Sequence, residues 1–153
     1  MLWNAKEVGM YIQEKAYIDT VIVPLLPISF SGNTKQEAEQ AEFITLLTTL
    51  LEKQFKGRMM LIPPFTYMNI EKKEDKVRKL QNWCNELKNQ EFEHVVCLTS
   101  DPMWKEVEQD FHASLLWMPS IPLEHMDEKY KQKIVDDQVN QLVKIIVQKW
   151  QNA

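Results

Sequence analysis

Short apolar runs alternate with longer stretches of helical periodicity along this chain. Four runs have the length of a strand, at residues 20–26 (TVIVPLL), 59–62 (MMLI), 94–98 (HVVCL) and 114–118 (SLLWM). They are nearly continuous in hydrophobic residues, which is typical of strands buried on both faces, as in parallel sheets. The pattern therefore predicts four buried strands.

Helix-length segments flank these strands. Asn4 is placed to cap the first helix, Asn33 or Thr34 the second, and Asp101 followed by Pro102 is a strong helix start, while Gly57 is expected to end the second helix. The predicted helices are residues 5–16, 34–55, 72–89, 102–111 and 128–150.

Strands that alternate with helices form parallel sheets with right-handed crossovers. Residues 1–153 are therefore expected to form one α/β domain, a three-layer α/β/α sandwich around a short parallel sheet of about four strands. By analogy with doubly wound sheets, we expect the strand order 2-1-3-4. Residues 65–70 (FTYMNI) are expected to be a loop.

The composition narrows the class of protein. The 153 residues include 44% hydrophobic and 26% charged residues, an ordinary globular composition, and the net charge of −4 disfavours nucleic acid as the main partner. Residues 21–28, the longest apolar stretch, contain two prolines and are too short to span a bilayer, and the N-terminus lacks the apolar run of a signal peptide. We therefore expect a cytoplasmic protein without membrane insertion, in which Cys84 and Cys97 are reduced and buried.

Polar residues follow the carboxyl end of each predicted strand, the edge at which open parallel sheets bind ligands. With the helix N-termini there, they suggest a pocket for a small ligand or an anion. The same residue types also cap helices and form turns in any α/β protein, so both interpretations stay open. The candidate ligand-binding residues are Ser29, Ser31, Asn33, Thr66, Tyr67, Ser100, Asp101 and His125.

Catalytic motifs are absent from the sequence. No serine has the flanking glycines of a nucleophile elbow, and neither glycine-rich nucleotide fingerprint occurs. His125, with Glu124 and Asp127 nearby, is the one histidine expected at the functional edge, whereas His94 and His112 precede strands. A catalytic zinc site needs three protein ligands, so we expect no metal site and no cofactor, and we assign no catalytic residue.

The last predicted helix is apolar on more than one side, although a surface helix needs only one apolar stripe. The excess indicates either a contact with a protein partner or a second copy of the chain, or deep packing against the sheet. The two groups are Val135, Val139, Leu142 and Ile146 on one side, and Ile134, Val143, Ile145, Val147 and Trp150 around it.

Two stretches carry a family resemblance. The segment from WNAKEV at residue 3 through YIDTVIVPLLPISF to residue 30, and LIPPFTY at residues 61–67, resemble the YpiF-like family, a domain of unknown function in Bacillus-type bacteria. The resemblance covers essentially the whole chain and implies a bacterial cytoplasmic protein without an established activity. The chain also bears a fainter similarity to creatininase-type amidohydrolases. It lies in the order of strand, polar loop, helix and second strand, ended by two prolines. Those enzymes bind metal through a Glu and a His in the first loop, and residues 27–34 contain neither.

We therefore expect an uncharacterised, non-catalytic binding or protein-interaction domain, acting through the strand-edge loops or the last helix. The alternative is a small metal-independent hydrolase or transferase built on His125, Asp101 and the loop hydroxyls. The alternative would gain if His125 lay within hydrogen-bond reach of Ser29, Ser31, Thr66 or Asp101 in a closed pocket. The sequence does not fix the activity, the ligand or the oligomeric state.

Overall fold

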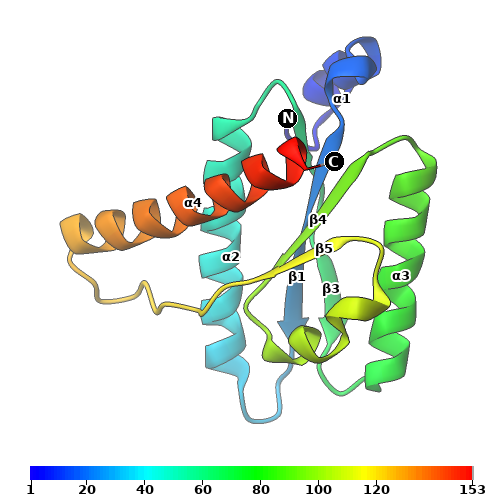
Figure 1. The fold of residues 1–153 in the computed structure, drawn as a ribbon. Helices are drawn as coiled ribbons and strands as arrows, with labels where there is room; N and C mark the ends of the chain where they lie inside the picture. The colour runs from blue at the N-terminus through cyan, green and yellow to red at the C-terminus, as the bar shows by residue number, and fades with distance from the viewer. Residues whose placement is uncertain (153) are drawn as a thin grey trace.

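Five parallel strands form the central sheet in the computed structural model, which describes residues 1–152 (Figure 1). The sheet order is β2-β1-β4-β5, and β3 pairs with β1 on the same side as β2. The α/β fold class is confirmed, and the order of the four predicted strands matches the expected 2-1-3-4. The strands are β1 (Thr20–Ile28), β2 (Met59–Leu61), β3 (Phe65–Met68), β4 (His94–Thr99) and β5 (Ser114–Trp117).

The prediction of a loop over residues 65–70 was wrong for its first four residues, which form β3. β2 pairs with the start of β1, and β3 pairs with its end, from Leu25 opposite Phe65 to Ile28 opposite Met68. Pro63 and Pro64 separate β2 from β3, because proline has no N–H to donate to a ladder. β1 consequently extends two residues beyond its predicted end.

The two prolines of β1 lie where one neighbouring strand is missing. Pro24 is opposite β4 on one side, but on the other side it faces the interruption between β2 and β3. Pro27 pairs with β3, whereas the pairing with β4 has already ended at Pro24. A proline is tolerated in a sheet where no ladder hydrogen bond is lost, so β1 can be central and contain both.

Helices cover both faces of the sheet (Figure 1). One face is covered by α2 (Thr34–Gln54) and α4 (Glu128–Gln151), and the other by α1 (Ala5–Gln13), α3 (Lys73–Asn89) and the 3-10 helix η2 (Pro102–Asp110). Burial of each large apolar side chain contributes about 1.5–3 kcal/mol. The first core includes Ile22, Phe43, Ile44, Leu47, Val96, Leu98 and Leu142, and the second includes Val21, Val23, Leu80, Cys84, Cys97 and Trp104.

The predicted helix starts are more accurate than the predicted ends. The side chain of Asn4 accepts a hydrogen bond from the backbone N–H of Glu7 at 2.8 Å, which confirms the first cap. The first helix ends at residue 13, and a separate 3-10 turn, η1 (Lys15–Tyr17), follows it. Phe55, not Gly57, caps the end of α2, so the expected glycine stop was wrong.

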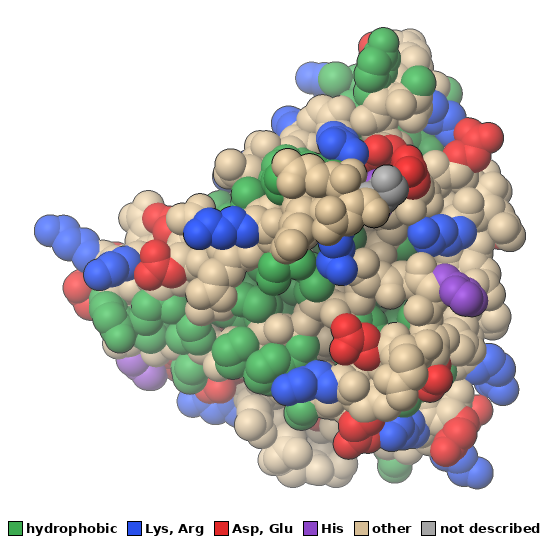
Figure 2. Space-filling model, in the orientation of Figure 1, with side chains coloured by type: hydrophobic (Ala, Val, Ile, Leu, Met, Phe, Trp, Pro, Cys, Tyr) green, Lys and Arg blue, Asp and Glu red, His purple; other side chains and the backbone are tan. Residues whose placement is uncertain are grey.

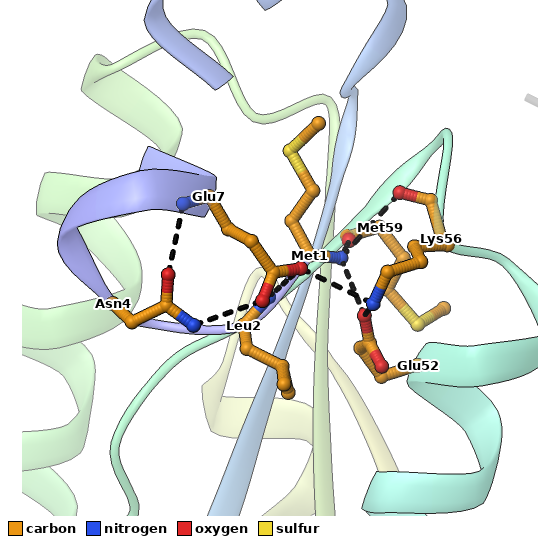
Figure 3. Close-up of polar contacts among 7 residues, drawn as sticks. All are labelled: Met1, Leu2, Asn4, Glu7, Glu52, Lys56 and Met59. Carbon is orange, nitrogen blue, oxygen red and sulfur yellow. Dashed lines mark hydrogen bonds and ion pairs between the residues drawn. The ribbon is translucent and has the colours of Figure 1, made fainter. Parts of the chain in front are cut away.

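The first two residues extend the sheet beside β2 (Figure 3). Leu2 forms a parallel bridge with Leu61, and the Met1 ammonium donates to the Met59 carbonyl. The same ammonium forms an ion pair of 3.1 Å with Glu52, a side chain of α2 that is 1% exposed. At this end of the sheet, near the start of β1, the buried carboxylate of Glu52 is therefore neutralised by the Met1 ammonium.

Two further predictions concern the core and the helices. Cys84 and Cys97 are free and buried, as expected, with their Sγ atoms 3.9 Å apart. None of the helices in residues 1–152 combines the length and the hydropathy that crossing a membrane requires.

Candidate functional site

Three loops meet at the carboxyl edge of the sheet, after β1, β3 and β4. The first two are joined directly, because the Asn69 N–H donates to the Ile28 carbonyl at 2.8 Å. A cavity of about 230 Å³ lies among these loops and the first turns of α2, and we call it the polar cavity. It is lined by Pro27, Asn33, Gln36, Glu37, Gln40, Asn69, Asp101 and Pro102.

Glu37 in the first turn of α2 is the buried charged residue of this cavity, with 5% of its surface exposed. Its Oε1 accepts a hydrogen bond of 2.8 Å from the Asn69 side-chain amide. Its Oε2 has no hydrogen-bond partner among the described residues. Buried polar atoms are nearly always paired, so this carboxylate, beside the polar cavity, has hydrogen-bonding capacity left for a donor.

Asn69 also joins Glu37 to a buried lysine. The Lys76 ammonium, on α3, donates to the backbone carbonyl of Asn69 at 3.0 Å and to its side-chain oxygen at 3.1 Å. It lies 5.5 Å from the centre of the Tyr67 ring. Lys76 therefore positions the loop after β3 and makes no direct ion pair with Glu37.

Asp101 belongs to a second chain of hydrogen bonds at the same edge. One oxygen accepts from the Tyr67 hydroxyl at 2.6 Å, and the other accepts from the Met103 N–H at 3.0 Å, which confirms the predicted cap. The Tyr67 hydroxyl in turn accepts from the Trp104 indole at 2.8 Å. Burial, followed by the charge of Asp101, raises the pKa of Tyr67, so the phenol stays protonated and acts as a hydrogen-bond donor.

A second hollow of about 230 Å³, the apolar cavity, adjoins the first, because Pro27 and Glu37 line both. Around this edge, the last residues of β1 and β3 and the loops that follow them expose large apolar side chains, which we call the apolar rim. Phe30 is 82% exposed and Ile70 is 86% exposed. The apolar cavity is lined by Pro27, Ile28, Ser29, Phe30, Thr34, Glu37, Ala38 and Ala41, and the apolar rim consists of Ile28, Phe30, Met68 and Ile70.

The structure brings together half of the predicted site residues. Asn33 and Asp101 line the polar cavity, Tyr67 is bonded to Asp101, and Ser29 lines the apolar cavity. Ser100 is next to this group in the chain, and its buried Oγ has no partner among residues 1–152.

The other predicted residues lie elsewhere. Ser31 and Thr66 are exposed and line neither cavity, and the Thr66 hydroxyl donates to the Pro64 carbonyl at 3.4 Å. The His125 side chain is 85% exposed and pairs with Glu124 at 3.2 Å. His125 therefore does not join the carboxyl-edge site.

The residues that helices contribute to the site were not predicted from the sequence. Among them are Glu37, Gln40 and Lys76. Glu37 did carry a signal, because it lies seven residues before Ile44 and fourteen before Leu51, on the buried side of α2. A glutamate at a position in register with a buried apolar stripe is unusual enough to mark a site.

A group of possible metal ligands lies at the opposite edge of the sheet. Ligand atoms of Asp19, Glu93 and His94 are all within 4.8 Å of one another. Both Asp19 oxygens already accept hydrogen bonds from Arg58, at 3.0 and 3.1 Å. Burial raises the pKa of Asp19, but the bonds from Arg58 and Thr20 outweigh it and hold this pKa below its usual range. A metal ion would have to compete with the guanidinium, so we assign no metal to this group.

By its fold and its site, the protein is a parallel α/β/α sandwich with a polar cavity and an adjoining apolar cavity at the carboxyl edge of the sheet. The chain belongs to the DUF2487 family of proteins of unknown function, whose family model matches residues 9–150. The uncharacterized protein YpiF of Bacillus subtilis (strain 168) is 38% identical over 150 residues, which is 98% of each chain. The predicted YpiF-like resemblance is confirmed, whereas these matches give no support to the similarity with creatininase-type amidohydrolases.

One solved structure is similar at a low level. It is a sigma-54 interaction domain protein from Enterococcus faecalis, with a TM-score of 0.43 and 8% sequence identity. The alignment covers 83% of this chain and 95% of that chain. A similarity of this size carries no argument about function.

Proposed function

We propose that this protein is a non-catalytic interaction domain that binds another protein at the carboxyl edge of its sheet. The observation that carries the proposal is the apolar rim, at the ends of the paired strands β1 and β3 and on the loops that follow them. Exposed apolar side chains that gather around a hollow are typical of protein contact sites, since covering them contributes about 25 cal/mol per Å² of apolar surface.

The rim is held in place before any partner arrives. Ile28 and Met68 are paired residues of adjacent strands. The Glu71 carboxylate accepts the Met68 N–H at 2.9 Å and also pairs with Lys79, which fixes the loop after β3. A pre-organised surface loses little conformational freedom on binding, and this supports a binding role.

The same geometry gives little support to the hydrolase or transferase alternative. Within residues 1–152, His125 makes no hydrogen bond with Ser29, Ser31, Thr66 or Asp101, and its Nε2 lies 3.2 Å from a Glu124 oxygen. Tyr67 is fully engaged in hydrogen bonds. Catalysis by an acid–base pair needs groups within hydrogen-bond reach of one another, so this arrangement favours a binding role over catalysis.

The C-terminal helix is a second surface for a protein partner or for a second copy of the chain. Its main stripe packs within the chain, and Trp150 packs against Phe55 and donates to the Thr20 hydroxyl at 2.8 Å. Tyr130 and Ile145 remain exposed, and Figure 2 shows a band of hydrophobic side chains between α4 and the segment that precedes it. Contact through α4 stays a prediction, with this band as its surface.

Site-specific photo-cross-linking tests the proposal. A photoreactive phenylalanine analogue replaces Phe30 or Ile70 in the full chain in its native host, and the control replaces Ile12, an exposed apolar residue of α1. We expect a discrete protein adduct from positions 30 and 70 that position 12 does not give. Equal adducts from all three positions, or none from 30 and 70, would overturn the proposal.

A further inference from the structure

Two buried glutamates of α2 differ in their partners. Glu52 has two cationic partners, the Met1 ammonium at 3.1 Å and Lys56 at 2.7 Å (Figure 3). Glu37 is nearly as deeply buried, but one of its oxygens has no partner among the described residues, and it has no ion pair there. The chain therefore neutralises the Glu52 carboxylate with two cations of its own, whereas Glu37 has no cationic partner among the described residues.

Negative charge is also in excess around the polar cavity. Glu37 and Asp101 contribute two carboxylates, and Lys76 contributes one ammonium, whose two hydrogen bonds go to Asn69. Buried charges in proteins are normally paired, so the excess of carboxylates favours a positively charged group as the ligand. The net charge of −4 for the whole chain also favours a basic partner.

The dimensions of the cavities fit side chains. A water molecule occupies about 30 Å³, so a hollow of about 230 Å³ accommodates a single long side chain. Lysine and arginine present several N–H donors at the end of a flexible stem, and Gln40 offers a further acceptor, since its Oε1 has no partner among residues 1–152. The apolar cavity, which shares Pro27 and Glu37, is placed to take a neighbouring apolar group.

We infer that the partner inserts a lysine or arginine side chain into the polar cavity, where its charged head pairs with the Glu37 carboxylate. An aliphatic or aromatic side chain next to it in the partner's sequence enters the apolar cavity and contacts the apolar rim. This inference rests on the proposed function, and it adds the chemistry of the partner: a short segment with a basic residue beside an apolar one.

Selection from a random peptide library displayed on phage tests this inference on the full chain. We expect the enriched peptides to carry a lysine or arginine beside an aliphatic or aromatic residue. For the best peptide, Glu37→Gln should weaken binding by roughly tenfold or more. The control Glu42→Gln removes the same charge from an exposed position of α2 and should change binding by less than about twofold.

A change on the peptide provides a readout that is independent of protein folding. Replacing its basic residue with glutamine should weaken binding to the unmodified protein as much as Glu37→Gln does, and should have little further effect on the Glu37→Gln variant. Peptides that bind without a basic residue, lose affinity on Phe30→Ser and ignore Glu37→Gln would overturn the inference while the proposed function stands. A library that yields no peptide dependent on Phe30 would overturn both.

Discussion

Glu37, Glu52 and Lys76 are charged residues of helices whose side chains are almost completely buried. Glu52 binds the start of the chain and Lys76 holds the loop after β3, so both stabilise the fold. Glu37 makes one hydrogen bond and leaves one oxygen unpaired. A residue that is buried without full compensation costs stability, and such costs are commonly associated with binding sites.

A matched pair of substitutions separates these roles. Glu52→Gln removes a buried ion-pair partner and should lower the free energy of unfolding by about 3 kcal/mol. Glu37→Gln keeps the bond from Asn69, so the free energy of unfolding should stay unchanged or rise by up to about 1 kcal/mol. Urea denaturation of both variants measures the difference. Equal destabilisation by the two would contradict the distinction.

Glu7 gives the protein a defined acid sensitivity. Hydrogen bonds from Asn4, Lys56 and the Leu2 N–H lower the pKa of Glu7 from its ordinary 4.5 to about 2 (Figure 3). A lowered pKa in the folded state means that the ionised form stabilises the fold above the unfolded pKa. That contribution is complete above about pH 4.5 and is lost as the pH falls from there toward 2.

Comparison with Glu7→Gln isolates this contribution. The unmodified protein should be more stable than the variant at pH 7, and the difference should shrink between pH 4.5 and 2. Denaturation curves at a series of pH values measure it. A difference that is constant across this range would show that the ionisation of Glu7 is not its source.

At the scale of elements, strands made of a continuous apolar run were predictable, and β3, in which buried and exposed residues alternate, was not. β1, β2, β4 and β5 are the four apolar runs of the sequence. In β3, buried Phe65 and Tyr67 alternate with exposed Thr66 and Met68, and two prolines precede the strand. Proline normally ends a strand, and here the ladder simply resumes after it.

The candidate site was predictable to the extent that loops build it. Asn33, Tyr67 and Asp101 were found because the ends of parallel strands meet at one edge. Glu37 and Lys76 come from helices, where a charged residue is usually part of the solvated face. Both side chains hydrogen-bond to Asn69, which is distant in the sequence from Glu37, and so the tertiary structure was needed to find them.

The hydroxyl of Tyr67 connects β3 to η2, and its removal tests the importance of that connection. Tyr67→Phe leaves an Asp101 oxygen and the Trp104 indole without their shared partner, and it should lower the free energy of unfolding by about 1–3 kcal/mol. Tyr130→Phe, on an exposed residue of α4, is the control and should have no measurable effect. Urea denaturation of both variants provides the comparison, and an unchanged Tyr67→Phe protein would refute the connection.

At the scale of the whole molecule, the two edges of the sheet differ. At the amino edge, the Met1 ammonium pairs with Glu52, and the ring of Trp150 lies 3.9 Å from the Arg58 guanidinium. The carboxyl edge has two hollows, an unpaired carboxylate oxygen and the apolar rim. The carboxyl edge thus combines exposed apolar surface with unsatisfied buried polarity, and there we place the partner.

Photo-cross-linking at Phe30, compared with Tyr130 on α4 and Ile12 on α1, tests this placement most directly, because all three are exposed apolar residues on separate parts of the molecule. The account predicts a discrete adduct with a second protein from position 30, and predicts that Glu37→Gln in the same chain reduces its yield. An adduct from position 130 alone would place the contact on the C-terminal helix and would contradict the account.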